Sequence, residues 1–182
     1  MLNAGVSRVD ISPVAGVAHA GWGAQTHQVS LGNDMSSLVT ALVVTNNDVE
    51  LAIVDVDILL FHPEQDQQIR GLISEKSGIL YENIRLAYTH THSGPITNHQ
   101  WIKQGISLAE EWWDTIPGAC ARAVVDAKNS IKSARVGFDR GSCNININRR
   151  PSRPNGKLFT GRNWDGFVDH DVDVLGIDDI DG

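Results

Sequence analysis

The feature that most constrains the fold is a pair of β-branched runs, joined by a short turn, that is followed by a helical segment and a third such run. Residues 38–45 and 50–57 are apolar, and a turn-forming Asn-Asn-Asp cluster separates them, so they predict a β-hairpin. Residues 63–77 show helical spacing, and residues 84–92 predict another strand. Because a strand-helix-strand crossover makes its two strands parallel, the pattern predicts an α/β fold with a mixed β-sheet and flanking helices.

The remaining segments extend this sheet and set the domain organisation. We expect a strand at residues 5–11, a helix at about 107–133, and two further strands at 134–138 and 172–177. A chain of 182 residues, 41% of them hydrophobic, can form a single domain, 1–182, or a fragment of a larger one. The final Asp-Gly is a hairpin signal without a following strand. We therefore expect the chain to be truncated before the end of a catalytic domain.

Composition excludes several classes of partner. The 22 acidic residues outnumber the 15 basic ones, and no long Lys/Arg run occurs, so no nucleic acid partner is expected.

The sequence has no transmembrane segment and no signal peptide, which predicts a cytoplasmic protein by default, or a secreted or periplasmic one if a signal was removed. Cys120 and Cys143 provide neither a thiolate zinc site nor a disulfide framework. Strand edges left open by truncation favour a homo-oligomer.

The segment most suggestive of chemistry is 88–95, Tyr-Thr-His-Thr-His-Ser-Gly-Pro, at the end of the third β-branched run. Two imidazoles one residue apart project to the same face of an extended backbone, where they can converge on one cation or one substrate oxygen. His90 and His92 therefore mark a candidate active-site edge. The alternative is that both are ordinary polar residues at the point where a strand reaches solvent.

Asp57 ends the strand 50–57, and the carboxyl ends of parallel strands form the usual site crevice of an α/β sheet. We expect it to open on the same edge as the two histidines. There its carboxylate can support a metal-binding His by fixing the tautomer of the ring. Alternatively Asp57 is a helix N-cap or turn residue. A metallohydrolase that uses His90, His92 and Asp57 would need only residues of this chain.

A second unusual segment is 144–151, in which Asn alternates with Ile before Arg149 and Arg150. The alternation predicts a half-buried strand, and a row of Asn, a poor strand former, indicates side chains that are engaged in hydrogen bonds. Arg149 would offer its guanidinium donors to a carboxylate or a developing oxyanion. The alternative is an edge strand with solvated Asn side chains and an Arg-rich turn.

Two of these segments together resemble the amino-terminal part of the neutral/alkaline (non-lysosomal) ceramidase family. They are Thr89-His90-Thr91-His92-Ser93-Gly94-Pro95 and Asn146-Ile147-Asn148-Arg149 followed by Pro151-Ser152. Four weaker segments fall in the family's order, so that the resemblance covers nearly the whole chain: Gly5 to Ser12, Gly21-Trp22, Val54 to Asp57, and Asp171 to Leu175.

The resemblance implies a zinc-dependent amidohydrolase that cleaves the N-acyl bond of ceramide. It makes His90 a zinc ligand, and His92 and Arg149 active-site residues that contact the substrate or the reacting centre. Gly21 and Asn148 are then expected to bind substrate. Zinc would polarise the amide carbonyl and activate a water molecule, while His92 and Arg149 would stabilise the oxyanion or carry a proton to the leaving amine.

The sequence also departs from the family. The family's other zinc ligands, a second His, a Glu and a Tyr, belong to sequence beyond residue 182. We therefore expect residues 1–182 alone to bind zinc weakly and to be inactive. Residues 96–101 lack the Gly-aromatic continuation of true ceramidases, and Arg149, Arg150 and Asn163 look more like compact bacterial relatives. The expected substrate is therefore ceramide or another small or lipid-like N-acyl compound. The alternative is a non-catalytic ligand-binding or assembly module with the same fold.

Overall fold

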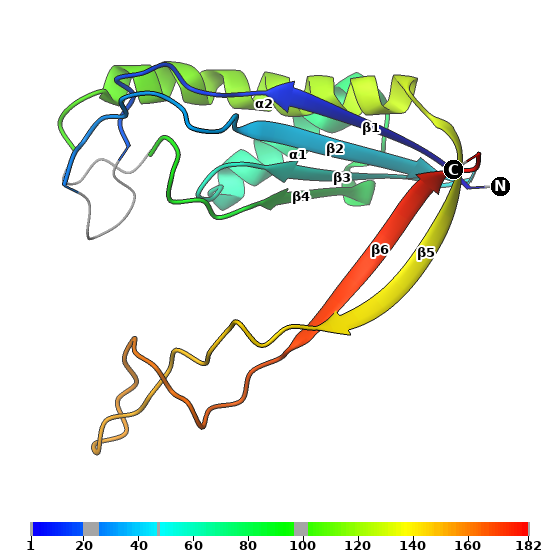
Figure 1. Cartoon of the computed structure of the whole chain (residues 1–182). Coiled ribbons are helices and arrows are strands. Elements are labelled where there is room, and N and C mark those ends of the chain that lie inside the picture. The colour runs from blue at the N-terminus through cyan, green and yellow to red at the C-terminus, as the bar shows by residue number, and fades with distance from the viewer. Residues whose placement is uncertain (1, 20–25, 47, 97–101, 182) are drawn as a thin grey trace. The chain divides into compact units, whose positions relative to one another are not determined.

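The computed structural model describes residues 2–19, 26–46, 48–96 and 102–181, and Figure 1 shows how their elements follow one another. The chain divides into two compact units, Met1–Ala134 and Arg135–Gly182, which are described separately. The helices and strands are β1 (Asn3–Asp10), β2 (Leu38–Thr45), β3 (Glu50–Val56), α1 (Pro63–Ser77), the 3-10 turn η1 (Tyr81–Asn83), β4 (Ile84–Tyr88), α2 (Ile106–Asn129), β5 (Lys132–Ser142) and β6 (Asp171–Asp179).

The strands form a mixed sheet in the order β4-β3-β2-β1-β5-β6. β2 pairs antiparallel with both β1 and β3, so the predicted hairpin is present. β3 pairs parallel with β4 after the crossover through α1. β5 begins in the first unit, where Lys132 and Ser133 pair with Ala4 and Asn3. The prediction of an α/β fold with a mixed sheet is confirmed.

The core of the first unit lies between one face of the sheet and the two helices (Figure 1). Alternate residues of β2 and β3 are buried on this face, among them Val39, Val43 and Val54, each 0% exposed. Ile73 of α1 and Val124 of α2 are buried in the same cluster. Each fully buried side chain of this size contributes about 1.5–3 kcal/mol, so the period-two pattern of the strands decides which face the helices cover.

β1 packs against α2 at very short range. A side-chain carbon at Gly5 would collide with the carbonyl oxygen of Ala127, and Ser7 Oγ donates to the Ala123 carbonyl at 2.7 Å. Trp112 Nε1 donates to the Ile11 carbonyl just after the strand. Only a glycine allows the strand and the helix to approach this closely.

Two predicted strands differ from the structure. The strand expected at 84–92 ends at Tyr88, so His90 and His92 lie in the loop that follows it. The segment 144–151 is not a strand, because its regular pairing is limited to an isolated bridge between Asn148 and Asn163. Asn side chains here bond to main-chain groups, which competes with a strand ladder.

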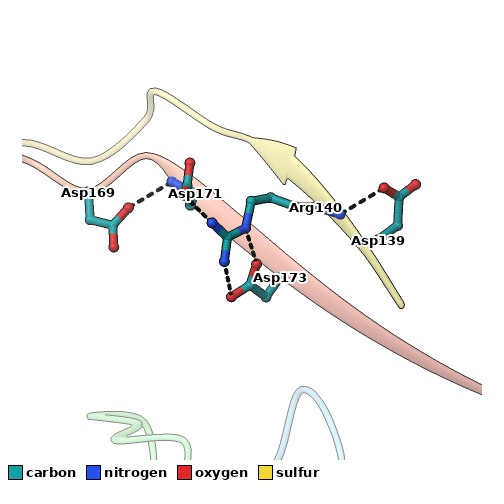
Figure 2. Close-up of polar contacts among 5 residues, drawn as sticks. All are labelled: Asp139, Arg140, Asp169, Asp171 and Asp173. Carbon is teal, nitrogen blue, oxygen red and sulfur yellow. Dashed lines mark hydrogen bonds and ion pairs between the residues drawn. The ribbon is translucent and has the colours of Figure 1, made fainter. Parts of the chain in front are cut away.

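In the second unit, β5 and β6 are joined by a charge cluster around Arg140 (Figure 2). The guanidinium binds both carboxylate oxygens of Asp173, at 2.5 and 3.0 Å, and Asp171 Oδ2 at 2.9 Å. All three side chains are more than half exposed, so each pair contributes only up to about 1 kcal/mol, although the two-pronged geometry links β5 to β6.

Candidate functional site

The loop that carries both histidines runs beside the end of β3. The Thr89 amide donates to the Val56 carbonyl at 3.1 Å, and the Thr91 amide donates to the Ile58 carbonyl at 3.2 Å. These bonds continue the parallel β3–β4 pairing past the last paired residues, Val56 and Tyr88. The strand ends therefore bring Asp57 and the histidine loop to one edge of the sheet, where both histidine side chains are exposed.

His90 adopts a left-handed backbone conformation, with φ at 58°. The prediction that both histidines extend from a flat strand face is therefore wrong. Their rings are nevertheless close, with centroids 5.2 Å apart and the planes at 90°. A non-glycine residue in this region costs free energy, of order 1 kcal/mol or more, unless its surroundings hold it there.

One of the groups that hold His90 is a main-chain oxygen. His90 Nδ1 lies 2.7 Å from the carbonyl oxygen of Leu59. A carbonyl oxygen can only accept, so Nδ1 carries the hydrogen and the neutral ring keeps its free electron pair on Nε2. Metal-binding histidines commonly use their second nitrogen in this way. His90 can thus supply one nitrogen ligand to a metal ion.

A row of aromatic rings leads from helix α2 to the two histidines. Trp113 contacts Phe61 with ring centroids 5.7 Å apart, Phe61 contacts Tyr88 at 5.9 Å, and Tyr88 contacts His90 at 6.3 Å. Contacts at these separations favour particular ring orientations. Leu59 and Tyr88 therefore contact His90, and Phe61 contacts Tyr88. The sequence carries no local signal for the Leu59 contact, because Leu59 lies 31 residues away from His90.

Asp57 has a different partner from the one expected. Its Oδ2 accepts a hydrogen bond from the Leu38 amide at 2.9 Å, while its own amide donates to the Leu38 carbonyl at 2.9 Å. The hydrogen-bond partner of His90 Nδ1 is the Leu59 carbonyl instead. The carboxylate of Asp57 also contributes to raising the pKa of Asp55, after the burial of Asp55, which is the larger cause.

The described residues contain no group of three or more His, Cys, Asp or Glu side chains that could hold a metal ion. The alternative in which His90, His92 and Asp57 together form a metal site is therefore not supported. Zinc bound to His90 would need further ligands from outside the described part of the chain.

A cavity of about 620 Å³ lies in the first unit beside the histidine loop. Asp57, Thr89, Thr91 and Ser93 line it together with His19. Burial, and secondarily the proximity of His27, lowers the pKa of His19. The two rings are 5.5 Å apart. Gly21, the predicted substrate-binding residue of the preceding loop, lies outside the described residues.

Arg149 and Asn148 belong to the second unit and are described by themselves. Asn148 Oδ1 accepts from the Arg150 amide at 2.9 Å, and Asn148 Nδ2 donates to the Phe167 carbonyl at 3.0 Å. Asn146 Nδ2 likewise donates to the Asp169 carbonyl at 2.9 Å. These amides hold the segment 144–151 to the segment before β6. Arg149 itself is exposed.

Comparisons of the sequence with a family model and with curated proteins agree on one family. The model of the "Neutral/alkaline non-lysosomal ceramidase, N-terminal" family matches residues 2–156. Neutral ceramidase A of Dictyostelium discoideum is 31% identical over 131 residues, which are 68% of this chain and 18% of that protein. Neutral ceramidase B of the same organism is 34% identical over 105 residues, 55% of this chain and 15% of that protein. The chain thus spans less than a fifth of these curated relatives.

Two solved structures share the fold across the whole chain. The neutral ceramidase of Pseudomonas aeruginosa superposes with a TM-score of 0.75 at 20% identity, and the match covers 100% of this chain and 30% of that one. A ceramidase complexed with C2 gives a TM-score of 0.71 at 18% identity, covering 100% and 29%. At these identities the structures establish the fold alone.

Proposed function

Since the chain belongs to the neutral/alkaline non-lysosomal ceramidase family, whose amino-terminal model matches residues 2–156, we propose that it contributes to zinc-dependent hydrolysis of an N-acyl amide bond. The substrate is ceramide or another small or lipid-like N-acyl compound. The observation that carries the proposal is the contact between His90 Nδ1 and the Leu59 carbonyl. Because this contact places the hydrogen on Nδ1, the free electron pair that a metal ligand needs is on Nε2.

His90 would hold the zinc ion through Nε2, together with ligands from outside the described residues. When bound, zinc acts as a Lewis acid toward the amide carbonyl and lowers the pKa of a water molecule. The chain's own contribution is to present Nε2 as an acceptor. The Leu59 carbonyl sets the tautomer, and the Tyr88 and His92 rings lie next to the imidazole.

His92 would bind the substrate or move a proton at the reacting centre. It is exposed, its ring lies next to that of His90, and the nitrogens of an imidazole can donate or accept a hydrogen. Arg149, Asn148 and Gly21 remain predicted substrate-side residues. Arg149 is proposed to donate to an oxyanion, because its guanidinium is charged at all physiological pH values.

The test is His90→Ala in the full-length protein, with zinc content and release of a fluorescent amine from an N-acyl substrate as the two measurements. We expect loss of tight zinc and a fall in kcat/KM of at least about a hundredfold. His62→Asn is the matched control, because it replaces an exposed histidine at the start of α1 with a residue favoured there. Full activity in the His90→Ala protein would refute the proposal.

The same measurements separate the alternative of a non-catalytic module. A module of that kind would hold no zinc and release no amine in its unmodified form, while still folding as described. Zinc binding together with N-acyl hydrolysis would exclude it.

A further inference from the structure

Two histidines outside the Thr-His-Thr-His loop form a second close pair. The ring centroids of His19 and His27 lie 5.5 Å apart, and the ring planes are at 80° to each other. Two imidazoles that bind one tetrahedral zinc ion through bonds of about 2.0–2.1 Å place their ring centres about 5 Å apart. The observed separation therefore suits one metal ion held between the two rings.

The main chain brings the two histidines together. Ala18 and Val29 form an isolated antiparallel bridge. Beside it, the His19 amide donates to the carbonyl oxygen of Gln28, the neighbour of His27, at 2.8 Å. The backbone therefore makes this pairing, and no ion is needed to create it.

The stretch before α2 holds both sides of this bridge. The Ala18 amide donates to the Gly105 carbonyl at 2.9 Å, and Gln28 Oε1 accepts from the Lys103 amide at 2.8 Å. A side-chain carbon at Gly105 would collide with the Gly16 carbonyl oxygen, so the contact is close. Because both segments are anchored to the same stretch, binding of an ion requires little additional ordering of the chain.

Both rings are chemically available as ligands. Neither imidazole has a hydrogen bond or an ion pair with a described residue. Burial, with a smaller contribution from His27, holds the pKa of His19 below its ordinary value, so this ring is neutral near pH 7 and one nitrogen keeps a free electron pair. His27 is exposed, which leaves room for water molecules in the other coordination positions of an ion.

The charges near His19 favour a cation. His19 lines the cavity of about 620 Å³ together with Asp34 and Asp57, and no Lys or Arg is present among the described lining residues. Two carboxylates in a partly enclosed space raise the local concentration of cations and repel anions. The electrostatic surroundings of His19 therefore support metal binding.

We propose that His19 and His27 together bind one divalent transition-metal ion of the zinc type. Imidazole nitrogen suits Zn²⁺, Cu²⁺ and Ni²⁺, whereas Mg²⁺ and Ca²⁺ prefer oxygen ligands. The described residues offer no third His, Cys, Asp or Glu that completes such a group, so water molecules fill the remaining positions. The ion joins the segment that ends at His19 to the segment that begins at His27, and it is distinct from the zinc ion proposed at His90.

The test is a titration of the ¹⁵N-labelled 182-residue chain with Zn²⁺, followed through the side-chain nitrogens of histidine in long-range nitrogen-proton spectra. We expect one ring nitrogen of His19 and one of His27 to shift together and to saturate with the same dissociation constant, on the order of 10 µM. A shift at one of the two residues alone, or at neither, would overturn the proposal.

His19→Gln and His27→Gln test whether the two rings share the ion. Each substitution should weaken zinc binding at the remaining imidazole at least about tenfold, because the second ligand no longer binds within the same molecule. His62→Asn, which replaces an exposed histidine at the start of α1, is the matched control and should leave both dissociation constants unchanged. An unchanged constant at His19 in the His27→Gln chain would refute a shared ion.

Two further titrations separate this site from other cation sites. Mg²⁺ should shift neither imidazole, and equal shifts with Mg²⁺ would assign the ion to the carboxylates and overturn the proposal. His90→Ala should leave the zinc-induced shifts of His19 and His27 unchanged, even where it abolishes zinc binding at the candidate active site. Their loss in the His90→Ala chain would mean that the chain has one metal site, and the proposal of a separate one would fail.

Discussion

Asp57 and Leu38 exchange two hydrogen bonds at the end of the β2–β3 pair, one through the carboxylate of Asp57 and one through its main-chain amide, both 2.9 Å long. Leu38 begins β2 and Asp57 directly follows β3. The carboxylate therefore supplies the acceptor that the Leu38 amide needs where the strand ladder ends. In this way Asp57 fixes the start of the segment that carries Leu59.

We expect Asp57→Ala to reduce the free energy of unfolding by about 1–2 kcal/mol, because the Leu38 amide loses its acceptor. Asp57→Asn keeps a side-chain oxygen in the same place and should cost less than half as much. Urea denaturation of the two variants measures the difference. Equal losses would show that the charge of Asp57, and not its acceptor oxygen, is what matters.

His90 should exist in the folded chain with its hydrogen on Nδ1 when the ring is neutral, because the Leu59 carbonyl accepts it at 2.7 Å. Long-range nitrogen-proton spectra distinguish the two tautomers of each imidazole. Denaturation of the chain in urea should abolish the preference. Predominant protonation of Nε2 in the folded chain would contradict the geometry and weaken the case for His90 as a ligand.

Two glycines should respond in opposite directions to the same substitution. Gly5→Ala places a methyl group against the Ala127 carbonyl and should destabilise the first unit by at least about 2 kcal/mol. Gly118 lies in α2, and a methyl group there meets nothing within 4 Å. Gly118→Ala should therefore stabilise the first unit by about 0.5–1 kcal/mol. Thermal unfolding of the pair measures both effects. A neutral Gly5→Ala variant would refute the close packing of β1 on α2.

His19 should make stability depend on pH in a defined direction. Its pKa in the folded chain lies below the ordinary value of 6.5, so the unfolded chain takes up its proton first as the pH falls. The contribution of His19 to stability is therefore fully present above about pH 6.5 and is lost as the pH falls through its folded pKa. His19→Gln should flatten the slope of stability against pH in this window. An unchanged slope would contradict the burial of the ring.

The open edge of the sheet should lead to self-association. β4 ends the strand order and pairs only with β3 among the described strands, which leaves one side of its main chain available to another strand. Light scattering of the purified chain over a range of concentrations should show dimers or larger species. A strictly monomeric chain at all concentrations would contradict this prediction.

The sheet was predictable from sequence because its signals are local. The runs at 38–45 and 50–57 match β2 and β3 within one residue, and the helix at 63–77 matches α1. The strand predicted at 84–92 was too long because the β-branched pattern ends before the Thr-His-Thr-His segment, and loop bonds to Val56 and Ile58 replace the ladder there. Periodicity cannot reveal such bonds between distant segments.

The candidate site was predictable only in part. Paired histidines after a strand can be found in the sequence. Their rings lie close together in the structure, although the backbone at His90 is left-handed and not extended as predicted. The partner of His90 could not be found in this way, because it is a main-chain oxygen 31 residues away. Nor could the contact between His19 and His27 be predicted, since the bridge between Ala18 and Val29 that brings them together depends on three-dimensional packing.

The Leu59 contact also has a consequence for genetic studies of this chain. Every residue type has a carbonyl oxygen, so a scan of side-chain substitutions at position 59 would record tolerance even if the hydrogen bond to His90 were indispensable. Replacement of the amide linkage after Leu59 by an ester, which weakens the carbonyl as an acceptor, is the kind of change that would expose its contribution. A position that tolerates every side chain can thus still orient a site residue through its main-chain carbonyl.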